Sequence, residues 1–88
     1  MKVTFRKSFT RDLQKITDEK LLGRVEGRIG QIESAATLCD ISDLKKLVGA
    51  ESCYRIRVGE FRIGLIVRQG EVQLVRFLHR RDLYRHFP

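Results

Sequence analysis

The chain has 88 residues, of which 42% are hydrophobic and 33% charged, and this length provides one hydrophobic core rather than two. No apolar run approaches the length of a transmembrane helix, and the N-terminus lacks the apolar segment of a signal peptide, so we expect one cytoplasmic domain spanning residues 1–88. The formal net charge of +7 favours a polyanionic partner.

The first part of the chain predicts a short strand and two helices. Residues 2–6 alternate and are rich in Val, Thr and Phe, which is typical of a strand. Ser8 is expected to cap a helix that runs to about Ile16, and Thr17 a longer helix whose apolar stripe continues to Ala36. Three glycines inside the longer helix indicate either a close neighbour or tolerated exposed positions; they are Gly23, Gly27 and Gly30.

The second part predicts an antiparallel meander. Residues 44–47 form a short amphipathic turn, and from residue 52 the apolar period changes to two. Strands are expected at 52–58, 61–68 and 71–78, with two-residue turns between them, followed by a short helix or turn at 80–87. The predicted fold class is α+β: a small antiparallel sheet, made of the N-terminal strand and the meander, packed on a helical hairpin, with a short C-terminal helix.

A two-residue turn at Gly59-Glu60 determines which residues face each other in the first hairpin. Arg57 then lies opposite Arg62, and Arg55 opposite Gly64, on the face away from the helices. Like charges in facing positions are unfavourable, so this register indicates a pocket whose charge a bound anion balances.

The second hairpin adds an aromatic and a histidine to the same face. With a two-residue turn at Gln69-Gly70, Phe77 and His79 lie on the arginine face, whereas Arg76 lies on the core side. Either an edge position lets Arg76 reach solvent, which we favour, or a bulge changes the parity of the strand.

The basic residues after Glu51 indicate a ligand with phosphate groups. All eight are arginines, against three acidic residues, and the planar arginine fork suits phosphate better than lysine does. A merely solvated basic face is the plainer alternative. With neighbouring aromatic rings, the arginines suit single-stranded RNA. Cys39, Cys53, His79 and His86 lack the spacing of a zinc site, so neither a metal nor a cofactor is expected.

Three segments in combination resemble the RelE/ParE family of bacterial toxin-antitoxin toxins. They are Leu44-Lys45-Lys46-Leu47, Tyr54-Arg55-Ile56-Arg57-Val58-Gly59-Glu60-Phe61-Arg62-Ile63 and Leu78-His79-Arg80-Arg81-Asp82-Leu83-Tyr84-Arg85. The resemblance covers nearly the whole chain and agrees with the predicted order of elements. It implies a metal-independent mRNA endoribonuclease that works in the ribosomal A site, inhibits translation and is neutralised by an acidic antitoxin.

The resemblance implies that the residues matching Arg55, Arg57, Arg62, Arg80 and Tyr84 hold and cleave the message. His79 is added because histidine suits proton transfer near neutral pH, and Phe77 because the predicted register places it on the arginine face. The candidates for catalysis are His79, Arg62, Arg80 and Tyr84, and the candidates for RNA binding are Arg55, Arg57, Arg81, Phe77, Lys45 and Lys46. Some RelE members carry lysines where this chain has Arg55 and Arg57, and arginine cannot act as a base. The group that accepts the 2′-OH proton is therefore His79, Tyr84 or a group of the ribosome or substrate, and histidine is the best suited near neutral pH.

Two other functions stay open at this stage. A ParE-like protein with the same fold would inhibit DNA gyrase by binding it, without catalytic groups of its own. A basic module could also bind RNA through the same arginines without cutting it. Codon preference, ribosome dependence and oligomeric state have no signal in the sequence.

Overall fold

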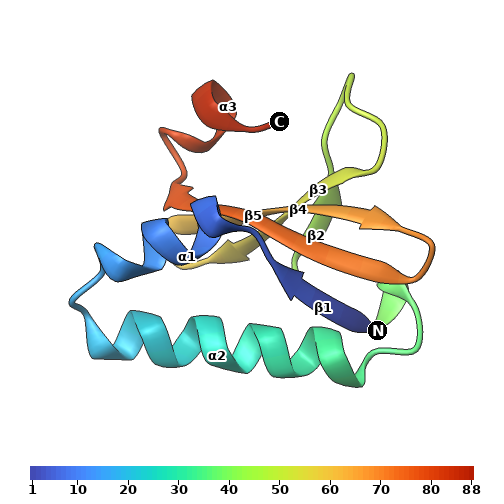
Figure 1. Ribbon diagram of the computed structural model, residues 1–88, viewed down its shortest axis with the longest axis horizontal. Helices are drawn as coiled ribbons and strands as arrows, with labels where there is room; N and C mark the ends of the chain where they lie inside the picture. Colours follow the sequence, from blue (N-terminus) through green and yellow to red (C-terminus); the bar gives the residue numbers. More distant parts are fainter.

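The structure is a computed structural model that describes residues 1–88, and it contains one five-stranded sheet with helices on both faces (Figure 1). The sheet order is β1-β5-β4-β3-β2; β1 is parallel to β5 and all other pairs are antiparallel. The elements are β1 (Lys2–Phe5), α1 (Lys7–Gln14), α2 (Glu19–Ser34), a 3-10 turn (Leu38–Asp40), β2 (Leu44–Lys46), β3 (Cys53–Val58), β4 (Phe61–Arg68), β5 (Glu71–His79) and α3 (Leu83–His86).

The α+β fold class is confirmed, and the sheet differs from the prediction in two respects. The N-terminal strand pairs in parallel, so the sheet is mixed. The segment expected to be a turn at 44–47 is instead the edge strand β2, in which Lys45 lies opposite Arg55 and Lys46 opposite Tyr54. Lysines are common on edge strands because they discourage pairing with other chains. None of the helices has the length and apolar character needed to cross a membrane.

Both predicted helix caps are wrong, although both helices are present. Asp18 caps α2, because its carboxylate accepts hydrogen bonds from the backbone N–H groups of Lys20 and Leu21. Ser8 lies inside α1, and its hydroxyl donates to the carbonyl oxygen of Val75 in β5. The serine therefore joins the helix to the sheet instead of starting the helix.

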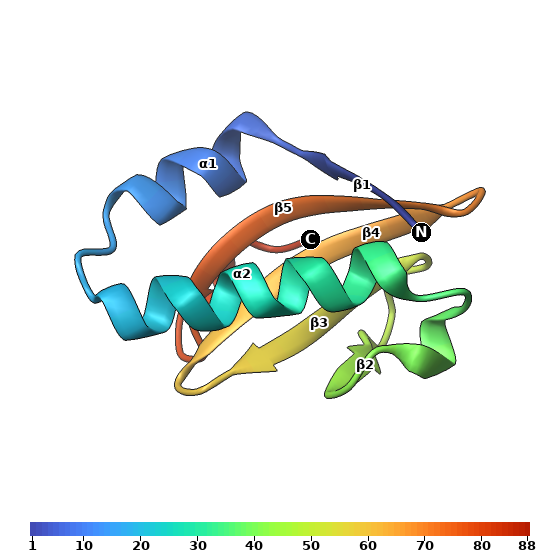
Figure 2. The same cartoon turned by 90° about the horizontal axis from the view of Figure 1, so that it is seen from below.

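Helix α2 covers one face of the sheet, and α3 lies on the opposite face (Figure 1). Figure 2 shows α2 crossing the strands. The main core lies between α1, α2 and the sheet, and it includes Phe9, Val25, Ile32, Ile56, Ile63, Leu65 and Phe77. The three glycines of α2 are exposed, and a Cβ at any of them would meet nothing within 4 Å, so no part of this chain approaches them closely.

The register of the second hairpin differs from the prediction. In the first hairpin Arg57 faces Arg62 and Arg55 faces Gly64, as expected. Between β4 and β5 the register shifts after Gly64, so that Leu65 faces Leu74 whereas Gly64 faces Arg76. The extra residue in β5 is a bulge, which reverses the parity of everything after it. The bulge, and not the edge position that we favoured, explains how the sheet accommodates Arg76.

The bulge moves two candidate site residues away from the arginine face. Phe77 faces Ile63 and is 1% exposed, so the prediction that it lies on the RNA-binding surface is wrong. His79 faces Phe61, and the two rings are in edge contact with centroids 5.6 Å apart. Phe61 also stacks on Phe77, which places all three rings on the helix side of the sheet.

An ion pair between α1 and β5 is formed at the bulge. Asp12 is 4% exposed, and its carboxylate accepts hydrogen bonds from Arg76 Nε at 2.7 Å and Arg76 Nη2 at 3.1 Å. The same carboxylate accepts the backbone N–H of Phe77 at 3.0 Å. One aspartate thus pairs with both the Arg76 guanidinium and the backbone N–H of Phe77. Without Asp12, both donors would lack this partner.

Replacing Asp12 with Ala is expected to destabilise the protein by about 2–4 kcal/mol, because Arg76 and the Phe77 N–H lose their partner inside the fold. Asp18→Ala is the matched control, since it removes only a helix cap worth about 1 kcal/mol. Urea unfolding followed by circular dichroism measures both. Equal losses of unfolding free energy for the two variants would show that the Asp12–Arg76 ion pair stabilises the fold no more than a helix cap does.

Candidate functional site

Four arginines and a tyrosine line an open cleft of about 380 Å³. Its residues come from neighbouring strands and from the segment that follows β5: Arg55 on β3, Arg62 on β4, Arg80 and Arg81 in the turn, and Tyr84 on α3. We call this the arginine cleft. No acidic side chain lines it, so it attracts anions.

Arg62 is the central residue of the arginine cleft. Its Nη1 donates to the carbonyl oxygens of Gly59 and Phe61, both at 2.9 Å, so the side chain is held in a defined position. Burial, and then the positive charges of Arg55 and Arg57, lower the pKa of the Arg62 guanidinium below its ordinary value. The surroundings of Arg62 therefore disfavour the positive charge that its guanidinium carries at neutral pH, and a bound anion would compensate this charge.

Glu60 is the residue of this region that the sequence interpretation missed. Its carboxylate lies 2.8 Å from Arg80 Nε, and its carbonyl oxygen accepts the Arg80 N–H at 2.8 Å. Both side chains are more than half exposed, so the ion pair itself is weak. The register assumed without the bulge placed Glu60 opposite residue 79, one position away from its observed partner.

A small second core holds Tyr84 and the rest of α3 against the sheet. Leu83 and Phe87 pack with Leu47 and Cys53, and Phe87 covers Gly64. A Cβ on Gly64 would lie 2.7 Å from Cδ2 of Phe87, so glycine is required for this contact. Apolar contacts therefore hold the C-terminal helix against the sheet.

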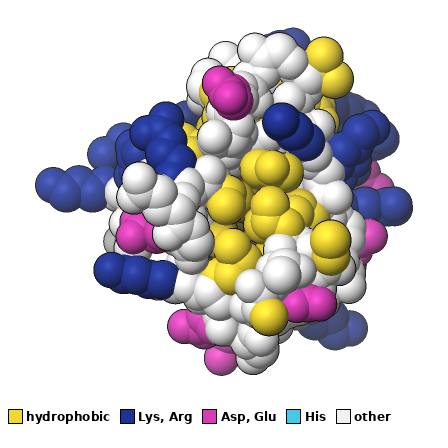
Figure 3. Space-filling view, turned by 90° about the vertical axis from the view of Figure 1, so that its right-hand side faces the viewer, with side chains coloured by type: hydrophobic (Ala, Val, Ile, Leu, Met, Phe, Trp, Pro, Cys, Tyr) yellow, Lys and Arg dark blue, Asp and Glu magenta, His cyan; other side chains and the backbone are white.

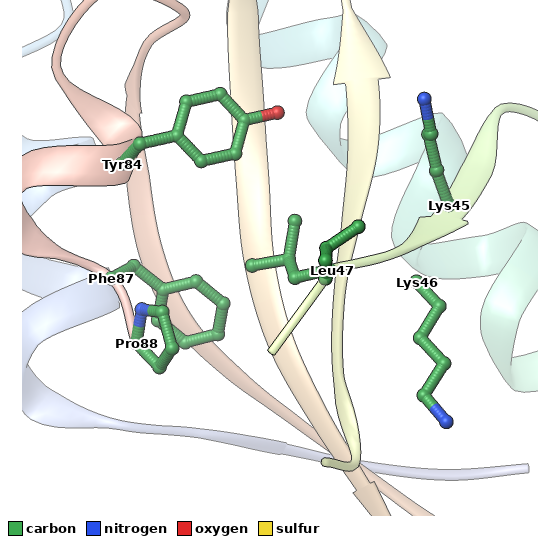
Figure 4. Close-up of a pocket in the computed structure, with 7 residues that line it drawn as sticks. Lys45, Lys46, Leu47, Tyr84, Phe87 and Pro88 are labelled. Carbon is green, nitrogen blue, oxygen red and sulfur yellow. The ribbon is translucent and has the colours of Figure 1, made fainter. Parts of the chain in front are cut away.

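Lys45 and Lys46 lie next to the arginine cleft and not in it. They line an adjoining hollow of about 360 Å³ with Leu47, Val48, Tyr84, Phe87 and Pro88. Figure 4 shows Tyr84 on one side of this hollow and the two lysines on the other, with Leu47 between them. Tyr84 is 61% exposed and borders both spaces.

His79 does not line the arginine cleft. It lines a separate hollow of about 260 Å³ together with Asp12 of α1, the two residues that follow α1, and Phe61. Its Nδ1 accepts the backbone N–H of Arg81 at 3.2 Å, which requires that Nδ1 carry no proton. This contact orders the turn that presents Arg80 and Arg81.

Positive charge is unevenly distributed over the surface. At the end of the molecule seen in Figure 3, hydrophobic atoms gather in the middle, and the Lys and Arg side chains stand mainly at the two sides. The four arginines that line the arginine cleft, with no acidic residue among its lining, favour a site over a uniformly solvated basic face. Arg57 is exposed beside the arginine cleft and lines a further space next to α2. No group of three or more His, Cys, Asp or Glu side chains is arranged to hold a metal ion.

Fold and site together define a small α+β domain with a cleft suited to a polyanion, and known proteins share this architecture. A family model described as the ParE toxin of type II toxin-antitoxin systems matches residues 3–84. Toxin RelE3 of Methanocaldococcus jannaschii is 37% identical over 89 residues, and the match covers 100% of both chains. The chain therefore belongs to the RelE/ParE family of toxins of type II toxin-antitoxin systems.

Solved structures agree with this assignment. A chain of the RelB-RelE antitoxin-toxin complex from Methanococcus jannaschii is 33% identical with a TM-score of 0.82, and the match covers 97% of this chain and 99% of that one. A chain of the RelE-RelB complex from Pyrococcus horikoshii is 20% identical with a TM-score of 0.73, covering 90% of this chain and 93% of that one. The second likeness supports the fold alone.

Sulfate is expected to stabilise the protein more than chloride does at equal ionic strength, because a divalent anion relieves the repulsion around Arg62. For a domain of this size, each kcal/mol of binding energy raises Tm by about 4–8 °C. Sulfate also stabilises proteins generally, so Arg62→Gln provides the baseline. Equal shifts for the wild type and the variant in a melting experiment would exclude an anion site at Arg62.

Proposed function

We propose that this chain is the toxin of a toxin-antitoxin pair and acts as a metal-independent endoribonuclease on mRNA in the ribosomal A site. The arginine cleft carries this proposal, because four arginines and one tyrosine line it and no carboxylate does. Such a cleft binds a phosphodiester and stabilises additional negative charge on it.

The reaction that fits this cleft is attack of a ribose 2′-oxygen on the adjacent phosphorus. The 2′-hydroxyl gives its proton to a base of the RNA or the ribosome, a new bond forms between the 2′-oxygen and phosphorus, and the bond from phosphorus to the 5′-oxygen breaks. The products are a 2′,3′-cyclic phosphate and a 5′-hydroxyl, which takes up a proton. Arg62 and Arg80 would stabilise the charged phosphorane, and Arg80 would exchange Glu60 for the substrate phosphate. Arg55, Arg57 and Arg81 would hold the neighbouring phosphates.

Tyr84 is better placed than His79 to act on the reacting atoms. Its ring borders the arginine cleft, where the phenol could donate a proton to the leaving oxygen or orient the phosphate. The His79 ring lies against Phe61, and one of its nitrogens accepts a backbone N–H. We therefore assign His79 a positioning role for the turn that carries Arg80 and Arg81.

Inhibition of DNA gyrase is the second candidate, because the matching family model is that of the ParE toxins. A gyrase inhibitor acts by binding a protein and needs no group that moves a proton. It would not require an arginine cleft with a tyrosine at its border, which is why we prefer the ribonuclease.

Tyr84→Phe is expected to slow mRNA cleavage by about 10²- to 10⁴-fold, the usual effect of losing a general acid or base. His79→Gln should slow it by less than tenfold, since this substitution alters only the support of the turn. Mapping of 5′-hydroxyl ends on mRNA bound to translating ribosomes measures both. A larger loss of cleavage rate for His79→Gln than for Tyr84→Phe would assign the proton transfer to His79 and the positioning role to Tyr84. If the wild type leaves the mRNA intact, the ribonuclease proposal is wrong.

We also propose an acidic antitoxin that covers the arginine cleft or displaces α3. Related toxins are known in complexes with RelB, and α3 carries Tyr84 at the border of the arginine cleft, so displacing this helix would disrupt the cleft. The association rate with the product of a neighbouring antitoxin gene is expected to fall steeply with salt, because opposite charges steer the encounter. Stopped-flow binding measures the rate. A complex that still cleaves mRNA at the full rate would contradict neutralisation by covering the cleft.

A further inference from the structure

A second, entirely polar cleft of about 220 Å³ lies where α2 meets the β3–β4 turn. We call it the α2 cleft; it shares no residue with the arginine cleft. Helix α2 covers the face of the sheet opposite α3, so the two clefts lie on opposite sides of the hairpin end (Figure 1). Its lining residues are Arg24, Arg28, Asp43, Arg57 and Gly59.

The guanidinium of Arg24 lies over Gly59. A Cβ at position 59 would lie 2.8 Å from Nη1 of Arg24, so the arginine rests directly on the glycine backbone. Gly59 also has a positive φ of 60°, as the two-residue turn requires. The same glycine thus allows the tight turn and lines the α2 cleft beneath Arg24.

Two positive charges of the α2 cleft have no carboxylate partner. Arg28 is paired with Asp43, and it also donates to the side chain of Gln31 at 3.2 Å. Arg24 and Arg57 form no ion pair. Placing unpaired guanidinium groups together is unfavourable unless an anion binds between them.

We propose that the α2 cleft binds a phosphodiester of the same RNA strand that the arginine cleft holds, which rests on the proposed function. Arg57 connects the two spaces, because it lines the α2 cleft and faces Arg62 across the β3–β4 pair. A strand leaving the arginine cleft can therefore pass from Arg62 over Arg57 to the α2 cleft. A protein partner would need apolar pockets for its anchoring side chains, and the α2 cleft has no hydrophobic lining residue.

The proposal predicts that longer RNA binds more tightly, and that Arg24 contributes to the gain. The probes are 2′-O-methyl oligouridines of about four and about twelve nucleotides, a range that single-strand sites span, and the blocked 2′-oxygen prevents cleavage. Arg24→Ala should lose roughly three- to tenfold in affinity for the long probe relative to the short one. The salt dependence of the long probe should weaken by about 0.7 in the slope of log K against log salt.

Arg68→Ala is the matched control. Arg68 is an exposed arginine at the opposite end of β4, away from the β3–β4 turn (Figure 2). The Arg68→Ala variant loses the same charge as Arg24→Ala, and its affinity should rise with RNA length as much as that of the wild type. Thermal melting confirms that both variants are folded.

Each result has a distinct meaning. If the wild type binds both probes but Arg24→Ala keeps the full gain with length, the α2 cleft is not part of the RNA path, and the proposed function still stands. If the wild type binds neither probe, the RNA path proposed here is overturned, and the mapping of 5′-hydroxyl ends on ribosome-bound mRNA decides separately whether the proposed function stands. If polyglutamate shows the same Arg24-dependent gain as RNA, the cleft recognises acidic protein, and the assignment to a phosphodiester is overturned.

Discussion

The contact between Asp12 and β5 is the constraint on which the arrangement of the site depends. The bulge after Gly64 leaves Arg76 and the Phe77 N–H beside α1, and the Asp12 carboxylate satisfies both. Because the bulge reverses the parity of the strand, Phe77 enters the core and Arg80 emerges next to Glu60. The turn that carries two arginines of the arginine cleft is therefore set by a carboxylate on a helix that lines no part of it.

Placing several arginines close together opposes folding because their positive charges repel. Contacts within the fold hold these side chains in position despite the repulsion. Arg62 is held by two backbone carbonyls of the tight β3–β4 turn, and Phe87 fills the space that Gly64 leaves open. Sites that bind charged ligands commonly carry such unfavourable features, which are balanced elsewhere in the fold. The core between α1, α2 and the sheet supplies that balance with a continuous set of buried apolar residues.

The sequence predicted the first hairpin correctly because a two-residue turn leaves one register, and alternation then assigns every side chain to a face. It failed one hairpin later because the bulge inserts a residue with no local mark except Gly64, and each subsequent residue changes face. That single shift accounts for the errors at Phe77 and His79. Strand β2 was missed because Leu-Lys-Lys-Leu is too short to distinguish a strand from a helical turn, and only pairing with β3 decides it.

The residues of the two clefts can bind phosphates, but they supply few groups that move protons. Arginines at 55, 57, 62, 80 and 81 can bind phosphates and stabilise charge at any physiological pH, but none of them can accept a proton. Neither cleft contains a histidine, and Tyr84 borders only the arginine cleft. If the chain cleaves RNA with Tyr84 as the proton donor, the base that receives the 2′-OH proton comes from the RNA or the ribosome. Dependence on the ribosome would then follow from the absence of a second titratable group in the arginine cleft.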